Sequence, residues 1–171
     1  MSIEVEMDSF NLLNITLKLR NGDTREFNIK DELAISKATL NEDVIEQPGK
    51  FAWWAAVAEQ AKHQRDHAET ELDKAEAQAD YNVRLKLELD GIKITEALVK
   101  QKIKLDKEYI SALNTYNLAK KNAATLDKVV KAFDQRLEAL INLGANLRKE
   151  ENNADISLKG MQDKARTITN K

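Results

Sequence analysis

The feature that most constrains this chain is a heptad pattern between residues 106 and 148. Apolar or small residues recur there at alternating steps of four and three, namely Ala112, Tyr116, Ala119, Ala123, Leu126, Val130, Phe133, Leu137, Leu140, Gly144 and Leu147. The positions between them are mostly charged or polar, and no Pro interrupts them. The spacing predicts one helix about 60 Å long at about 1.5 Å per residue. Such a long apolar seam must pack on another long helix, on a second chain, or on both.

The two halves of this seam differ in side-chain size. Small residues at 112, 119 and 123 allow close approach of a second helix, whereas residues 126–140 offer bulkier side chains. We interpret the first half as the packing face within the chain. The second half is the expected assembly face of a homo-oligomer, whose contact residues we predict to be Val130, Phe133, Leu137, Leu140 and Leu147.

A second long helix is predicted over residues 51–89. Its apolar and small positions are Trp54, Ala58, Ala61, Ala68, Leu72, Ala75, Ala79 and Val83, and Asp90-Gly91 is the stop signal. Thr95 is a suitable N-cap for a short helix over residues 96–104, and Asp106 can cap the long one. Because Ala-rich spacing occurs on both long helices, we expect an antiparallel pair.

Residues 12–29 have the pattern of a β-hairpin around Asn21-Gly22. A three-residue loop pairs Ile15 with Ile29 and Leu17 with Phe27, which places the apolar residues on one face. Residues 31–50 are interpreted as a connector with a short helical piece over residues 31–37. Since the apolar face of the hairpin is small, we expect that it can be removed without unfolding the helices.

These elements define a mainly α fold, a long antiparallel, coiled-coil-like helical hairpin with a small N-terminal β-hairpin. The composition agrees, because one third of the 171 residues are charged and the chain has only one Pro and five Gly. We divide it into an N-terminal hairpin and connector (1–40), a helical domain (41–150) and a C-terminal tail (151–171). The tail is expected to fray or to form one short helix.

The sequence offers no enzyme chemistry. Cys is absent and no glycine-rich phosphate loop is present, so we expect no catalytic residues and no cofactor. His63 and His67 lie one helical turn apart without an evident third ligand, so a metal site is not expected. Trp53 and Trp54 face different sides of a helix. We expect one to contact the core or the hairpin, and the other to pack in the core or an interface or to be a stacking platform for a base.

Positive charge is concentrated in one section of the chain. Residues 93–148 contain eleven Lys/Arg and six Asp/Glu, a net charge of +5, although the whole chain carries −2. Lys93, Lys100 and Lys104 recur at helical spacing, and Arg84 and Lys86 lie nearby if the chain reverses at Gly91. This concentration favours a local polyanion site, with an ordinary solvated helix face as the competing interpretation.

Several short runs carry a likeness to a known family. They are Gln47-Pro48, Trp54, Ala75-Glu76-Ala77-Gln78, Val83-Arg84-Leu85-Lys86-Leu87, Lys93-Ile94-Thr95-Glu96-Ala97, Asp106-Lys107-Glu108-Tyr109, Ala119-Lys120, Ala132-Phe133-Asp134-Gln135-Arg136 and Leu143-Gly144-Ala145-Asn146-Leu147-Arg148. Together they cover about residues 40–150, and this part of the chain resembles the UvsY-like recombination mediators of tailed phages. The N-terminal hairpin lies outside the resemblance.

The resemblance implies a non-enzymatic mediator in DNA recombination and repair. Such proteins bind single-stranded DNA, form ring-like homo-oligomers, and help a RecA-type recombinase displace the single-strand-binding protein in the cytoplasm of an infected bacterium. The family's basic pair corresponds to Arg84 and Lys86, and its C-terminal assembly region to residues 133–148. With the basic section, this predicts a DNA site at Arg84, Lys86, Lys93, Lys100 and Lys104. No membrane partner is expected, since no signal peptide or apolar span is recognisable.

A protein of a different class fits the same helices. A structural coiled coil or adaptor would bind other proteins, including a host factor, and not DNA. In the sequence, only the basic section discriminates between these two functions.

Overall fold

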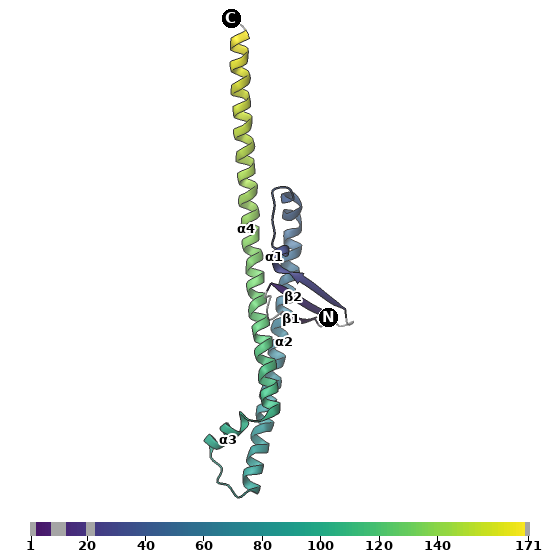
Figure 1. Cartoon of the computed structure of the whole chain (residues 1–171), viewed down its shortest axis with the longest axis vertical. Helices are drawn as coiled ribbons and strands as arrows, with labels where there is room; N and C mark the ends of the chain where they lie inside the picture. The colour runs from purple at the N-terminus through teal and green to yellow at the C-terminus, as the bar shows by residue number, and fades with distance from the viewer. Residues whose placement is uncertain (1–2, 8–12, 20–22, 170–171) are drawn as a thin grey trace.

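The computed structural model describes the backbone of residues 3–7, 13–19 and 23–169, and the side chains of residues 13–18, 23–156 and 158–159. Two long helices dominate, α2 (Leu40–Leu89) and α4 (Lys107–Thr169). They run antiparallel in contact with each other, and the short helix α3 (Glu96–Ile103) lies at the end where they are connected (Figure 1). The predicted mainly α helical hairpin is therefore confirmed.

The second long helix begins earlier than predicted. We expected a connector as far as residue 50, but α2 starts at Leu40 and contains Pro48 in its third turn. Pro48 cannot donate to the carbonyl of Val44, four residues earlier, and Val44 is 46% exposed, so water can reach that turn. Tertiary contacts of Asp43 and Gln47 with α4, described below, stabilise the segment against the local preference.

The C-terminal tail continues α4 without a break to Thr169. Frayed or separately folded residues after 150 were expected, and this expectation is wrong for the described residues up to 169. In Figure 1 this last part of α4 projects past the start of α2, with no other element alongside. The boundary that we placed at residue 150 is therefore not marked by any change in secondary structure.

The N-terminal part is a three-stranded antiparallel sheet in the order β1 (Ile3–Met7), β2 (Asn14–Leu19) and β3 (Thr24–Asn28). The predicted hairpin is β2–β3; β1 was not predicted. The observed register of β2 on β3 differs by two residues from the predicted one, because Ile15 pairs with Phe27 and Leu17 pairs with Arg25. The side chain of Asn28 caps helix α1 (Ile29–Glu32), which takes Ile29 out of the strand. Of the predicted turn Asn21-Gly22, both residues lie outside the described part of the chain.

Two separate clusters of buried side chains hold the molecule together. The larger one joins the sheet, the first half of α2 and the middle of α4: Ile15, Leu17, Ile29, Trp54, Val57, Ala58, Ala61, Ala123, Leu126, Val129 and Phe133. The smaller one joins the end of α2 to α3: Ala79, Leu87, Val99 and Ile103. We call these the sheet-end core and the tip core. Ile15 and Leu17 are almost fully buried, so the hairpin is part of the main core. We expected that the hairpin could be deleted because its apolar face is small, and this burial contradicts that reason.

The seam of α4 is rotated slightly from the predicted heptad. Leu126, Phe133 and Leu140 are buried as expected, but Val129 and Arg136 are buried between them, while Leu137 is 43% exposed. A straight helix has 3.6 residues per turn, so its buried face drifts from a strict 3.5-residue repeat. Asn122 is also buried on this stripe. The helix caps agree with prediction, since Thr95 caps α3, Asp106 accepts from the amides of residues 108 and 109, and Gly91 has φ 67° after α2.

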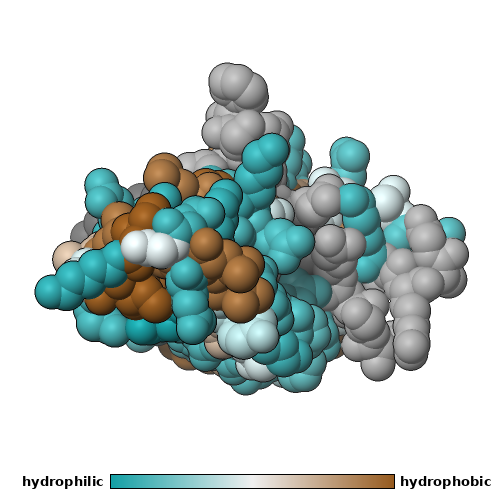
Figure 2. All heavy atoms as spheres, turned by 90° about the horizontal axis from the view of Figure 1, so that it is seen from below, coloured by the Kyte–Doolittle hydropathy of each residue, from teal (hydrophilic) through white to brown (hydrophobic). Residues whose placement is uncertain are grey.

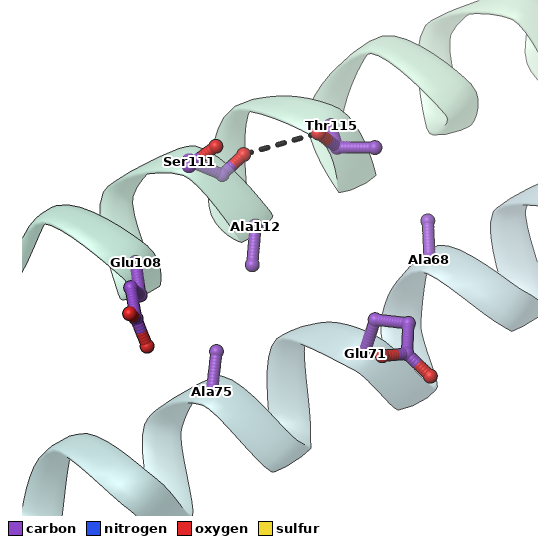
Figure 3. Close-up of a pocket in the computed structure, with 7 residues that line it drawn as sticks. All are labelled: Ala68, Glu71, Ala75, Glu108, Ser111, Ala112 and Thr115. Atoms are coloured by element: carbon purple, nitrogen blue, oxygen red, sulfur yellow. Dashed lines mark hydrogen bonds between the residues drawn. The ribbon is translucent and has the colours of Figure 1, made fainter.

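Small side chains face one another along the middle of the helix pair. Ala75 of α2 points toward Ala112 of α4, and Ala68 of α2 points toward α4 near Thr115 (Figure 3). These residues, with Glu71, Glu108, Ser111 and Thr115, line an open groove of about 350 Å³. The Ala-rich segments of the two helices thus face each other in the expected antiparallel pair, and their small side chains do not fill the space between the helices.

Candidate nucleic-acid interface

The predicted DNA-binding residues all lie at one end of the molecule, which we call the tip (residues 84–107). It comprises the end of α2, the connection through Gly91, α3, and the turn into α4 (Figure 1). The tip core holds α3 on α2, because Val99 and Ile103 pack against Leu87 and Ala79. Chain reversal therefore brings residues from both sides of Gly91 together, as the sequence predicted.

Arg84 is engaged by two carboxylates. Its Nε donates to Asp80 on the preceding turn of α2 at 2.7 Å, and its Nη2 donates to Glu96 in the first turn of α3 at 2.9 Å. Hydrogen bonds from Arg84 lower the pKa of Glu96, and the two carboxylates raise the pKa of Arg84. This side chain therefore fastens α3 to α2.

The four predicted lysines at the tip are all exposed. Lys86 lies on the last turns of α2, Lys93 on the connection, Lys100 on α3 and Lys104 at its C-terminal cap. Within the described residues, none of the four belongs to an ion pair, in contrast to Lys62 and Lys74 elsewhere on α2. Lys102 and Lys107 are also exposed at the tip.

Lys100 has a more acidic environment than the other three. It lines a shallow groove together with Asp73, Glu76, Asp80 and Glu96. Lys100 also contributes to the lowered pKa of Glu96. A phosphate beside Lys100 would therefore lie close to carboxylates as well, so Lys86, Lys93 and Lys104 are the better placed for anion contact.

Sequence reasoning missed an apolar patch at the same end. Five aliphatic side chains are exposed there: Leu85 (44%), Leu89 (79%), Ile92 (47%), Ile94 (39%) and Leu105 (74%). Figure 2 looks at the molecule from this end and shows apolar surface in neighbouring areas that hydrophilic side chains separate and border. The signal in the sequence was the alternation of Leu or Ile with Lys around residues 85–94, where none of these apolar residues belongs to the predicted apolar positions of the helix.

The predicted oligomerisation residues are divided between the core and the surface. Phe133 is fully buried and Leu140 is 1% exposed, so both are used inside the single chain. Val130 and Leu147 are half-buried, and Leu137 is 43% exposed. Ile141, one turn after Leu137, is 59% exposed and was not predicted. The surface available for assembly on this part of α4 therefore centres on Leu137 and Ile141.

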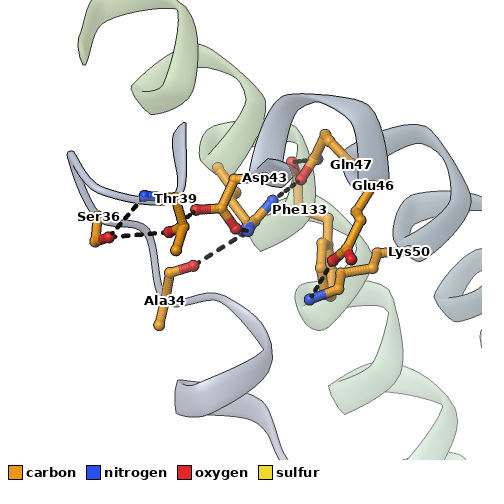
Figure 4. A network of polar contacts seen from close by, with 9 residues as sticks. Ala34, Ser36, Thr39, Asp43, Glu46, Gln47, Lys50 and Phe133 are labelled. Carbon is orange, nitrogen blue, oxygen red and sulfur yellow. Dashed lines mark hydrogen bonds and ion pairs between the residues drawn. The ribbon is translucent and has the colours of Figure 1, made fainter. Parts of the chain in front are cut away.

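A buried polar network at the sheet end was also not predicted (Figure 4). The Arg136 side chain, 2% exposed, donates to Asp43, to the Gln47 amide oxygen and to the Ala34 carbonyl at 3.1 Å. Gln47 in turn donates to the Phe133 carbonyl at 2.7 Å. A hydrogen bond from Thr39, with the charge of Arg136, holds the pKa of Asp43 below its ordinary value. The network fastens the start of α2 to α4 and has no access to a ligand.

The two tryptophans pack in or beside the core, whereas the two histidines face solvent. Trp54 is 1% exposed in the core, and Trp53, 37% exposed, packs against Phe27 with ring centroids 4.8 Å apart. His63 and His67 are exposed on α2. Within the described part of the chain, no group of three or more His, Cys, Asp or Glu side chains is arranged to hold a metal ion.

Comparison with known proteins gave no match to a family model, a curated protein or a solved structure. None of the helices in the described residues combines the length and apolar character that a membrane span needs. The residues of the tip therefore carry the functional argument.

Proposed function

We propose that this chain is a non-enzymatic, single-stranded DNA-binding protein that acts as a homo-oligomer. Its tip contacts the phosphates of the strand through Lys86, Lys93 and Lys104, with Lys100 as a weaker contact. The observation that carries the proposal is the gathering of exposed lysines, outside the ion pairs of the described residues, at the one end where α2, α3 and α4 meet.

Arg84 has a positioning role in this proposal. Its two carboxylate partners compete with any phosphate for the same donors, and they hold the helix that carries Lys100 and Lys104. We therefore replace its expected role as a DNA contact with one in shaping the site.

The binding mechanism is electrostatic. Each lysine that neutralises a phosphate releases a counterion, so a few contacts per subunit give weak and salt-sensitive binding. Several tips on one strand raise the affinity by avidity, which is why assembly matters for function. Phosphate contacts carry no base identity, so the protein discriminates little among sequences. Leu137 and Ile141 support assembly, because both are exposed apolar residues one turn apart on α4.

The resemblance to UvsY-like mediators supplies the wider role. We propose that the oligomer organises single-stranded DNA for a RecA-type recombinase and assists its exchange with single-strand-binding protein. This role belongs to recombination and repair in the cytoplasm of a phage-infected bacterium.

An adaptor that binds other proteins is the second candidate. The exposed Leu and Ile residues of the tip favour it, because an exposed apolar patch is often a protein-binding site. The adaptor would use the same end of the molecule but would have no affinity for DNA.

Anisotropy titrations of a fluorescent oligothymidylate at several salt concentrations test the proposal. The variant Lys86→Ala/Lys93→Ala/Lys104→Ala should bind more weakly and flatten the log–log salt slope by about 2, from about 0.7 per lost contact. The matched control is Lys121→Ala/Lys128→Ala/Lys131→Ala, which removes three exposed lysines from the middle of α4. Equal affinity and slope for the two variants, or no binding by the wild-type protein, would reject the DNA site in favour of the adaptor.

A further inference from the structure

We propose that the apolar patch of the tip binds the faces of unpaired bases and so makes the site selective for single strands. The patch consists of Leu85, Leu89, Ile92, Ile94 and Leu105. This inference rests on the proposed function, because the lysines beside the patch must first hold a strand.

The arrangement of side chains matches the two surfaces of a single strand. Lys86 follows Leu85, Lys93 lies between Ile92 and Ile94, and Lys104 precedes Leu105. Each lysine is therefore the chain neighbour of an exposed apolar residue, and neighbours on a helix project about 100° apart, so charged and apolar side chains face adjoining sides of the tip. A nucleotide likewise presents its phosphate and its base on different sides. A strand laid over the tip can place phosphates on the lysines and unstacked bases on the aliphatic side chains.

The two most exposed residues of the patch, Leu89 and Leu105, are not needed to build the tip. Leu87, Val99 and Ile103 form the core beneath the patch and are buried, whereas Leu89 and Leu105 keep 79% and 74% of their surface exposed. Apolar side chains that fill no core position are available for a ligand. In duplex DNA the base faces are covered by stacking, so only an unpaired strand offers the matching apolar surface.

The charge around the patch argues against a second tip as its occupant. Residues 84–107 contain seven Lys/Arg and four Asp/Glu, so two copies meeting at this surface would bring a net charge of +3 from each chain together, and like charges placed close together cost free energy. The occupant must combine negative charge with apolar surface, as single-stranded DNA does. A partner protein with an apolar, carboxylate-rimmed surface is the other class, and the test separates the two.

The experiment compares oligothymidylate with an abasic oligonucleotide of equal length and charge. The wild-type protein should bind oligothymidylate about tenfold more tightly, since burying the faces of the bases against aliphatic side chains removes apolar surface from water. Leu89→Asn/Ile92→Asn/Leu105→Asn should reduce this ratio to about one and leave the salt slope unchanged, because its phosphate contacts remain. Leu118→Asn/Ile156→Asn/Leu158→Asn, which changes three exposed residues of α4 away from the tip, should keep the wild-type ratio.

Three results would overturn the inference. Equal binding of the two oligonucleotides by the wild-type protein would leave the phosphate site intact and remove the role of the bases. A patch variant that keeps the tenfold ratio would also show that the patch does not bind the bases. If light scattering of that variant showed a smaller oligomer as well, the patch would be an interface between subunits. Failure of the wild-type protein to bind either strand would instead reject the proposed function itself.

Discussion

The two ends of the helical hairpin differ in the elements that cover the long helices and in the size of the side chains that they bury. At the sheet end, a three-stranded sheet covers the α2–α4 pair, and Trp54 and Phe133 are buried with their rings 6.2 Å apart. At the tip, the short helix α3 covers α2, and the core contains one Ala and three aliphatic residues, with Tyr109 of α4 packed against them. The sheet end therefore buries large side chains, while the tip leaves Leu89 and Leu105 exposed beside lysines. We infer that stability resides at one end and binding at the other.

Two arginines make this difference concrete. Arg136 and Arg84 each connect two elements, and each contacts a carboxylate on α2. The Arg136 side chain is 2% exposed and that of Arg84 is 37% exposed. Removing one partner of a buried pair leaves the other buried without compensation, whereas water screens an exposed pair. An arginine–carboxylate pair thus stabilises the sheet end strongly, whereas at the tip it mainly positions α3 on α2.

The largest effect is expected from breaking the buried network. Arg136→Met should lower the free energy of unfolding by about 3–5 kcal/mol, because Asp43 and Gln47 lose their donor in a dry site. Urea unfolding followed by circular dichroism measures the change. The exposed Arg148→Met is the control, and a loss under about 1 kcal/mol for Arg136→Met would show that the network is not a lock.

A pair of identical substitutions compares the two ends directly. Leu17→Ala at the sheet end should cost about 2–5 kcal/mol, since the residue is 1% exposed and its removal leaves a cavity. Leu89→Ala at the tip, where the residue is 79% exposed, should change thermal stability very little. Equal losses at the two positions would contradict the division of roles. The first substitution also tests whether the sheet can be dispensed with.

The smallest effect is expected from the exposed clamp. Arg84→Gln should speed amide exchange in α3, because Glu96 and Asp80 lose their shared partner, while the thermal midpoint stays close to wild type. Hydrogen exchange with mass spectrometry resolves the peptide. Arg65→Gln, which removes an exposed ion pair with Asp66 on the same helix, is the matched control. Unchanged exchange in α3 would mean that the tip core alone holds it.

The helical part of the fold was predictable because its signals are local and periodic. Asp90-Gly91, Thr95 and Asp106 marked helix ends correctly, and Ala58, Ala61 and Leu126 followed the apolar repeat. The early start of α2 was not predictable, since its support comes from Arg136, more than eighty residues further along the chain. The strand register also depended on Asn28 acting as a helix cap, which a pattern of alternation does not contain.

The candidate site was predictable in its place and not in its detail. Counting charges located the tip, and helical spacing grouped Lys93, Lys100 and Lys104. The pair of Arg84 with Asp80 is a local one at i,i+4 on α2, and helical spacing contains it. The pair of Arg84 with Glu96 and the acidic neighbours of Lys100 depend on how α3 folds back onto α2, so no linear pattern contained them. The exposure of Leu85, Leu89 and Leu105 also depends on how the tip folds, so we did not single out these residues from the sequence.

Hydrogen exchange with and without a single strand tests the division between the two ends most directly. Binding an oligothymidylate of about 15 nucleotides, the upper range of common site sizes, should slow amide exchange across residues 84–107. Exchange in residues 54–61 and 122–140, which form the sheet-end core, should stay unchanged. Protection of the sheet end without protection of the tip would contradict the account, as would unchanged exchange throughout the chain at a saturating concentration of the oligonucleotide.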